Sequence, residues 1–238
     1  MCAIERPGAR DSIRVTGHLF MRSAVLWDLD GTLVDSAESH FESWVEALAA
    51  EGRTILRSDF EATFGQRNDR ILARWLGSDV APHVVSRIAD AKEAAYRRIV
   101  RERGIDPLPG AAQWLAHLDS RGWKQAVATS APRLNVDVVL DVLHWSHYFD
   151  AVVAGEDVRL GKPDPEVFLT AAMRVGVPPS ACIVVEDAAA GIEAARRAGM
   201  PSIGVGAATA GAQPDLAVSS LTEVTEETWV RLAISPLS

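Results

Sequence analysis

Residues 24–36 read AVLWDLDGTLVDS. The first four residues of this stretch are apolar, and a short apolar run that ends at turn residues is typical of a strand buried on both faces of a sheet. Asp28 and Asp30 follow the run, and Gly31 provides the geometry of a turn. Two carboxylates this close repel each other unless a cation joins them. The stretch therefore predicts a buried strand that ends in a chemically active aspartate pair, and the alternative is a solvated pair in a turn.

The rest of the chain carries two different patterns. In residues 36–105 apolar side chains recur at the spacing of amphipathic helices, and we expect no strand there. From the PLPG sequence at 107–110 onward, short apolar strands alternate with helices, as in a parallel sheet covered on both faces. The expected strands lie at 124–129, 151–155, 181–187 and 202–206. The predicted fold class is α/β: an N-terminal tail at 1–22, a sheet-based core at 23–35 and 106–238, and an inserted α-helical cap subdomain at 36–105.

Polar clusters fall at the ends of several expected strands. In a parallel α/β sheet, ligands bind beyond the carboxyl ends of the strands. We therefore expect one common site that gathers four clusters: Asp28 with Asp30, Thr129 with Ser130, the segment from Gly155 to Lys162, and Glu186 with Asp187.

The residue types in these clusters suit phosphoryl transfer. Asp28 can attack phosphorus and become an aspartyl phosphate, while Asp30 exchanges a proton with the leaving or attacking oxygen. Lys162, held between a glycine and a proline, would neutralise charge on the nucleophile and the phosphoryl group. Thr129 offers a hydroxyl and an N–H to a phosphate oxygen, with Ser130 as the alternative one residue later. The blander interpretations are a solvated loop lysine and a threonine that caps the next helix.

Glu186 and Asp187 form a second acidic pair at a strand end. Adjacent carboxylates are costly there unless a cation is bound, and oxygen ligands with retained waters suit Mg²⁺. We expect Asp187 to be a direct ligand and Glu186 to act through water.

Taken in order, these motifs resemble those of the haloacid dehalogenase-like superfamily. The resemblance rests on DLDGTLVDS, the strand-end threonine, the lysine of GKPDP and the acid pair of VVEDAAAGIEAA, and it spans residues 24–206. It implies a Rossmann-like parallel sheet core, Asp28 as nucleophile and Asp30 as general acid/base. It also implies Mg²⁺ held by the Asp28 carboxylate, the Asp30 backbone carbonyl and Asp187. The helical insertion is similar to the cap of phosphoglycolate phosphatases, sugar phosphatases and β-phosphoglucomutase.

Several residues of the insertion are candidates for substrate binding. Ser36, His40 and Lys92 resemble residues of β-phosphoglucomutase, in which the histidine and lysine couple cap closure to the general acid/base. Arg67 suits a substrate phosphate or hydroxyl approached from the cap. For His40, Arg67 and Lys92 the alternative is a solvated position on a helix surface.

The segment after Thr129 favours hydrolysis over phosphoryl exchange. The mutase has polar residues there that hold a second phosphate, whereas Ala131 and Pro132 have no side-chain donors, and Arg133 replaces that function only in part. We therefore predict an Mg²⁺-dependent phosphatase that acts on a small organic phosphate, a sugar phosphate or a phosphoglycolate-like compound, through an aspartyl phosphate. The alternatives are a β-phosphoglucomutase-like mutase and a non-enzymatic protein on the same fold.

Composition limits the partners. The net charge of −8 disfavours nucleic acid. No apolar stretch approaches the roughly 20 residues that span a bilayer, so no membrane association is expected. Cys2 and Cys182 lie far apart, which indicates neither a disulfide nor a zinc site. We expect a small phosphorylated metabolite as partner and a cytoplasmic location; the oligomeric state stays open, with a monomer favoured.

Overall fold

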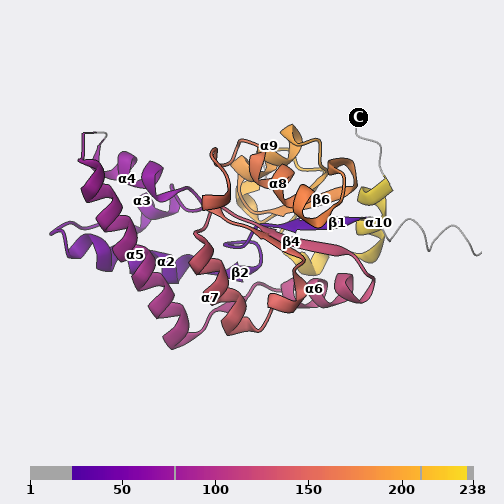
Figure 1. Cartoon of the computed structure of the whole chain (residues 1–238), viewed down its shortest axis with the longest axis horizontal. Helices are drawn as coiled ribbons and strands as arrows, with labels where there is room; N and C mark the ends of the chain where they lie inside the picture. The colour runs from indigo at the N-terminus through magenta and orange to yellow at the C-terminus, as the bar shows by residue number, and fades with distance from the viewer. Residues whose placement is uncertain (1–22, 78, 210, 235–238) are drawn as a thin grey trace, which may run out of the picture.

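The computed structural model describes residues 23–77, 79–209 and 211–234. The predicted N-terminal tail, residues 1–22, lies outside the described residues. The described chain forms a sheet-based core and, beside it, a separate group of helices (Figure 1). None of the described helices has both the length and the apolar character needed to span a membrane.

Six parallel strands form the core sheet. In spatial order they are β5 (Ala151–Val153), β4 (Lys124–Ala128), β1 (Ala24–Trp27), β6 (Cys182–Glu186), β7 (Ser202–Val205) and β8 (Leu216–Val218). The strand β1 is fully buried between β4 and β6, with Trp27 in register with Val127 and Val185. The predicted Rossmann-like α/β core is therefore confirmed. The edge strand β8 was not predicted, since only one of its three residues is buried and it lacks the apolar run of the inner strands.

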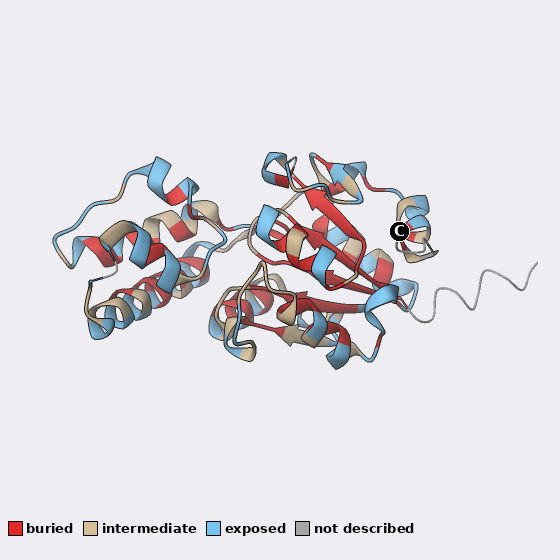
Figure 2. Ribbon diagram, turned by 90° about the horizontal axis from the view of Figure 1, so that it is seen from above, coloured by how far each residue is buried: buried red, intermediate tan, exposed pale blue. Residues whose placement is uncertain are grey.

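Helices cover both faces of this sheet because successive strand residues point to opposite sides. Val25 and Trp27 belong to an apolar cluster that includes residues of α6 (Ala111–Ser120), α7 (Arg133–Leu143) and α10 (Glu226–Ile234). Ala24 and Leu26 face a second cluster with α8 (Glu166–Val175) and α9 (Ala189–Arg197). Figure 2 shows the buried strands between helices whose outer faces are exposed. Short 3₁₀ turns complete the core: η2 (Ser146–Tyr148), η3 (Gly155–Asp157), η4 (Pro179–Ala181), η5 (Ala207–Thr209) and η6 (Leu221–Glu223).

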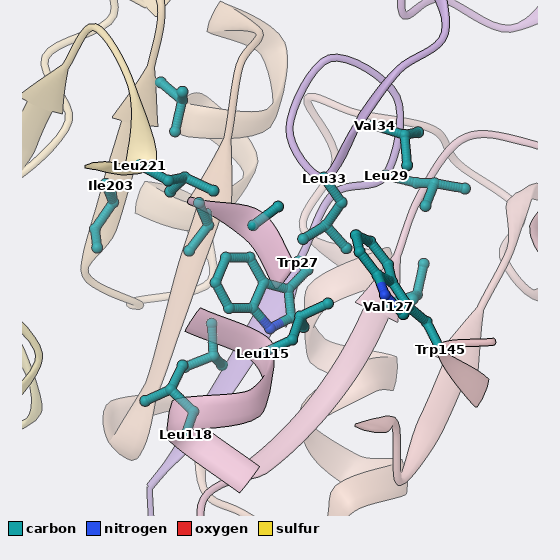
Figure 3. Packing of buried hydrophobic residues seen from close by; sticks show 14 of the residues in the cluster. Trp27, Leu29, Leu33, Val34, Leu115, Leu118, Val127, Trp145, Ile203 and Leu221 are labelled. Atoms are coloured by element: carbon teal, nitrogen blue, oxygen red, sulfur yellow. The ribbon is translucent and has the colours of Figure 1, made fainter. Parts of the chain in front are cut away.

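Trp27 anchors the central strand. Figure 3 shows its indole ring in the first cluster near Leu115, and its ring centroid lies 5.8 Å from that of Trp229. The indole N–H donates to Gln125 Oε1 at 3.0 Å, so this buried polar group is satisfied. Burial of a large apolar side chain contributes about 2–3 kcal/mol. The backbone that presents the next residue, Asp28, is thus held firmly.

The helical group is inserted directly after the first strand. It consists of α2 (Ala37–Ala49), α3 (Arg57–Glu61), α4 (Asn68–Leu76) and α5 (Pro82–Arg103), packed around an apolar cluster of their own that includes Trp44, Phe60, Leu72 and Ile88. The chain leaves the core along β2 (Val34–Asp35) and returns along β3 (Asp106–Pro107), and these two short strands pair antiparallel. The two connections therefore lie side by side.

Candidate active site

The polar clusters of the sequence meet at the carboxyl ends of three neighbouring strands. Asp28 follows β1, Thr129 follows β4, and Glu186 ends β6, and the sheet order places β1 between the other two. The amide N–H of Asp28 donates to the carbonyl oxygen of Val185 at 3.0 Å, which continues the parallel pairing up to the site. Residues separated by up to about 160 positions in the sequence are thereby brought together.

Lys162 joins the two acidic pairs. Its Nζ atom donates to Asp28 Oδ1 at 2.5 Å and to Glu186 Oε1 at 2.6 Å, and its side chain is only 7% exposed. Burial alone would lower the pKa of Lys162, but the two carboxylates outweigh it and raise the pKa. The lysine is therefore a fixed positive charge against the predicted nucleophile.

Asp28, Glu186 and Asp187 form a compact acidic cluster. One carboxylate oxygen from each lies within 4.8 Å of the others. Burial, and the negative charge of Glu186, raise the pKa of Asp28 to about 7 and that of Asp187 to about 9. The oxygens of Glu186 accept from Lys162 and from the Ala188 N–H. Three clustered carboxylate oxygens are the donor set that a hard divalent cation prefers. Glu186 is the member with both oxygens already engaged in hydrogen bonds.

Two glycines shape the space around the acidic cluster. Gly31 has a φ of +82°, and a Cβ at this position would collide with the Asp187 carboxylate. A Cβ at Gly191, in the first turn of α9, would collide with the Glu186 carboxylate. A side chain at either place would force the acidic side chain to move, and at Gly31 the positive φ also disfavours any other residue.

Asp30 belongs to a second network that continues into the helical insertion. Its Oδ1 lies 3.2 Å from His40 Nε2, and Lys92 Nζ lies 2.9 Å from His40 Nδ1. The His40 ring stacks on Tyr96 with centroids 4.0 Å apart. Burial would raise the pKa of Asp30, but His40 outweighs it and lowers the pKa; burial, followed by the charge of Lys92, lowers the pKa of His40. In the ligand-free site His40 therefore favours the carboxylate form of Asp30, and the His40 ring is itself held by stacking on Tyr96.

A cavity of about 440 Å³ lies between the core and the insertion. On the core side it is lined by Asp28, Asp30, Thr129 and Ser130. On the side of the inserted helices the wall is mixed: apolar residues such as Trp44, Phe64 and Ile71 alternate with polar and charged ones that include Gln66, Asn68 and Asp90. Thr129 is 2% exposed and its hydroxyl oxygen accepts the Ala131 N–H at 3.1 Å, so its hydroxyl hydrogen is the part that can point at a ligand.

The predicted substrate-binding residues divide into two groups. The first group, His40, Arg67, Lys92 and Ser130, lines the cavity. The second, Ser36 and Arg133, does not; Ser36 is fully buried at the N-terminus of α2. Arg133 does not reach the cavity lining: its Nη2 donates to Asp157 at 2.8 Å and to the Val152 carbonyl at 2.7 Å. Its guanidinium is thus engaged in an ion pair with Asp157 within the core.

Sequence reasoning did not select several polar residues that the site includes. Thr32 is fully buried and its hydroxyl lies 3.4 Å from Asp187 Oδ1. Glu93 is buried beside Lys92 and accepts from it at 2.9 Å. The sequence did contain a pattern that predicts burial of the neighbouring Lys92: Ile88, Ala95 and Ile99 recur around it at helical spacing and mark that face of α5 as buried. The partners of Glu93 on other elements had no such signal.

The chain belongs to the haloacid dehalogenase-like hydrolase family. The sequence model of that family, described as a hydrolase of the haloacid dehalogenase-like type, matches residues 23–199. The match agrees with the parallel sheet and with the acidic residues at its strand ends. The chain is therefore an enzyme of the haloacid dehalogenase-like class.

Particular members of the family resemble the chain over most of its length. Fructose-1-phosphate phosphatase YqaB of Escherichia coli is 34% identical over 193 residues, which are 77% of this chain and 96% of the relative. β-Phosphoglucomutase of Bacillus subtilis is 32% identical over 211 residues, 86% of this chain and 92% of the relative. The crystal structure of β-phosphoglucomutase from Clostridium difficile superposes with a TM-score of 0.80 at 28% identity and covers 90% of this chain and 100% of that one.

Proposed function

We propose that this enzyme hydrolyses a small phosphate monoester through an aspartyl phosphate on Asp28. The observation that carries the proposal is the position of Lys162, whose ammonium bridges Asp28 and Glu186 beside the acidic cluster. A buried cation at a carboxylate nucleophile stabilises the negative charge that gathers when a phosphoryl group arrives. The cavity of about 440 Å³ that Asp28 lines has room for a metabolite-sized leaving group.

The reaction has two displacements at phosphorus. In the first, Asp28 forms a bond to phosphorus while the bond to the ester oxygen breaks, and Asp30 gives that oxygen its proton; Asp30 takes up this proton from solvent before the step, because His40 favours its carboxylate form in the ligand-free site. In the second, Asp30 as a carboxylate takes a proton from water, the water oxygen bonds to phosphorus, and the bond to Asp28 breaks to release inorganic phosphate. His40, 3.2 Å from Asp30, holds the carboxyl group that carries the proton in both steps.

We propose Mg²⁺ as the cofactor. Asp28 and Asp187 would supply carboxylate oxygens, Asp30 its backbone carbonyl, and Glu186, whose oxygens already accept two hydrogen bonds, would act through water. When bound, the ion would neutralise part of the charge on the phosphoryl oxygens and the surrounding acids.

The metal-free enzyme is expected to lose stability as the pH rises. The pKa values of Asp28 and Asp187 are raised in the folded state, so the folded protein binds these protons more tightly than the unfolded chain. Their contribution is complete below the unfolded carboxyl pKa of about 4 and is lost as the pH passes through about 7 and about 9. Mg²⁺ at 100 times its Kd should add about 2.7 kcal/mol, or about 5–10 °C in Tm.

Thermal unfolding with EDTA and with Mg²⁺, at pH 6 and pH 8 and equal ionic strength, tests this prediction. The shift produced by one Mg²⁺ concentration should be larger at pH 8, because the ion competes with protons for the same oxygens. EDTA should also stop turnover and Mg²⁺ should restore it. An identical Tm with and without Mg²⁺ at both pH values would refute the proposal that the enzyme binds Mg²⁺ at this site.

The charges of the cavity favour a monophosphate as substrate. Arg67 and Lys92 are the strongly basic side chains among the described residues that line it. Arg67 lies 3.6 Å from Asp69, Lys92 is paired with Glu93, and Arg133 is bound to Asp157 elsewhere. Among the described residues that line this cavity, a second phosphate would thus meet no cation without a nearby carboxylate, whereas a sugar ring suits a wall that offers both Phe64 for stacking and polar groups for its hydroxyls. The relatives that act on fructose 1-phosphate and on phosphoglucose support the same substrate class.

We also propose that residues 36–105 act as a cap over the reacting phosphate. The cavity lies between these helices and the core, so their movement about the paired connections β2 and β3 would open and close it.

A panel of phosphorylated metabolites tests the substrate class. We expect release of inorganic phosphate from hexose or pentose monophosphates, with bisphosphates at least about 10-fold poorer in kcat/KM, a difference of about 1.4 kcal/mol. The mutase alternative is tested with glucose 1-phosphate and a hexose bisphosphate activator. If glucose 6-phosphate accumulates in excess of inorganic phosphate, the enzyme is a mutase and the assignment as a phosphatase is wrong.

A further inference from the structure

The carboxylate of Glu93 links three helices of the molecule. Glu93 lies on α5 and is 7% exposed. Its Oε1 accepts from Lys92 Nζ at 2.9 Å and from Asn68 Nδ2 on α4 at 2.7 Å. Its Oε2 accepts from Asn135 Nδ2 on the core helix α7 at 2.5 Å. One buried carboxylate therefore ties two of the inserted helices, α4 and α5, to the core helix α7.

All three side chains that contact Glu93 donate hydrogen bonds to it, so the residue at this position must accept at both of its terminal atoms. A carboxylate accepts at both oxygens, whereas an amide side chain in the same place has one accepting oxygen and one donating nitrogen. With glutamine here, a donor nitrogen would face the donor of Asn68 or of Asn135, and one buried contact would be lost.

On the cap side, the link leads to the proposed general acid. Lys92 donates to Glu93 and lies 2.9 Å from His40 Nδ1, so the ammonium selects the form of His40 that accepts at Nδ1. His40 Nε2 then carries the hydrogen that points at Asp30 Oδ1, 3.2 Å away. The pairing with Glu93 holds Lys92 in the direction that this chain of contacts needs.

On the core side, the link leads to the segment that lines the cavity. Asn135 lies in the first turn of α7, a few residues after Ser130 and Ala131, which line the cavity. Its carbonyl oxygen accepts from Arg97 Nη1 of α5 at 3.0 Å, and its amide donates to Glu93. Two adjacent turns of α5 thus bind the same core side chain. Figure 1 shows α5 and α7 side by side where the cap meets the core.

We propose that Glu93 is a positioning residue for the reaction: it holds the cap on α7 through Asn135 and, through Lys92 and His40, places Asp30 at the ester oxygen. The inference rests on the proposed phosphatase function. It predicts that the loss caused by disturbing Glu93 depends on how much the leaving group needs a proton.

The test compares kcat/KM of Glu93→Gln on two substrates: the best sugar phosphate of the panel and p-nitrophenyl phosphate. A sugar alkoxide must be protonated as it leaves, whereas p-nitrophenolate departs as a stable anion. We expect a loss of about 30-fold or more on the sugar phosphate, part of the 10²–10⁴-fold range of general acid catalysis, and of less than about 3-fold on the aryl ester. The double variant Glu93→Gln with Asn135→Asp places an acceptor opposite the new amide and should recover at least about 5-fold on the sugar phosphate.

Glu46→Gln is the matched control. Glu46 lies on α2 and pairs with Arg98 of α5 in an exposed ion pair, so the same chemical change should leave both substrates within about 2-fold of the wild type. If Glu93→Gln does not fold, Asn135→Ala gives the same two-substrate comparison with the carboxylate still paired to Lys92.

The outcomes separate the inference from the function on which it rests. Equal losses on the two substrates, or a double variant no better than Glu93→Gln, would overturn the positioning role while the phosphatase stands. A wild-type enzyme that hydrolyses neither ester, or undiminished activity in Asp28→Asn, would overturn the phosphatase function itself.

Discussion

Replacement of Asp28 by asparagine is expected to lower kcat on any phosphate monoester by on the order of 10⁴-fold or more, because the amide cannot form the covalent phosphoryl intermediate. The fold should survive. Asparagine has nearly the same shape, Lys162 keeps Glu186 as a partner at 2.6 Å, and burial already raises the pKa of Asp28 to about 7, which shows that the charge is costly there. We therefore expect a Tm of the metal-free variant no lower than that of the wild type.

The matched control for this substitution is Asp35→Asn. Asp35 belongs to the same DLDGTLVDS stretch but is exposed on β2 and pairs in register with Asp106, away from the acidic cluster. Its kcat should stay within about 2-fold of the wild type, as for surface substitutions generally. Phosphate release is measured on freshly purified protein, and incubation with substrate followed by mass measurement should detect a phosphorylated chain in the wild type only. Turnover by Asp28→Asn at a tenth of the wild-type rate would refute the nucleophile.

Lys162→Met is expected to lower kcat by about 10³-fold and also to destabilise the metal-free protein. The loss of activity follows from the removal of a buried donor aimed at the reacting carboxylate. Without the ammonium, the buried carboxylates of Asp28 and Glu186 repel each other, and removal of one partner of a buried ion pair costs about 3–5 kcal/mol. Urea unfolding should show the deficit at pH 8, and it should shrink at pH 5, where the carboxylates with raised pKa values take up protons.

Lys124→Met provides the comparison for a lysine at the surface. Lys124 also donates to a carboxylate, Asp150, at 2.5 Å, but its side chain is half exposed. Exposed ion pairs contribute at most about 1 kcal/mol, so this variant should keep its activity and most of its stability at both pH values. If the two lysine variants behaved alike, the charge of Lys162 would have no special role in the site.

The core and its acids could be predicted because they depend on local pattern and on one topological rule. Short apolar runs end in Asp28, Thr129 and Glu186, and the carboxyl ends of neighbouring parallel strands meet at one edge. Neither step requires knowledge of a particular side-chain contact. Prediction of the site also did not require the full order of the strands, because any sheet in which these three strands are neighbours brings the same residues together.

The cap contacts could not be predicted because they depend on how two packed bodies face each other. Glu93 and Asn135 are 42 positions apart on different helices, and only the orientation of α5 on α7 makes them partners. Arg133 illustrates the converse: it was expected at the substrate, but Asp157 and the Val152 carbonyl lie within hydrogen-bond distance of it. A long basic side chain selects among several acceptors in space, and the sequence does not rank them.

For this protein the sequence by itself determined the parallel sheet, the helical insertion and the chemical types at the strand ends, because hydrophobic periodicity and turn residues act over a few positions. Tertiary structure alone decided which charges pair: Lys162 with Asp28 and Glu186, Lys92 with Glu93 and His40, Arg133 with the core. The physical reason is that electrostatic and hydrogen-bond energies depend on distances of a few ångströms and on burial, and both arise only when elements remote in the chain are packed together.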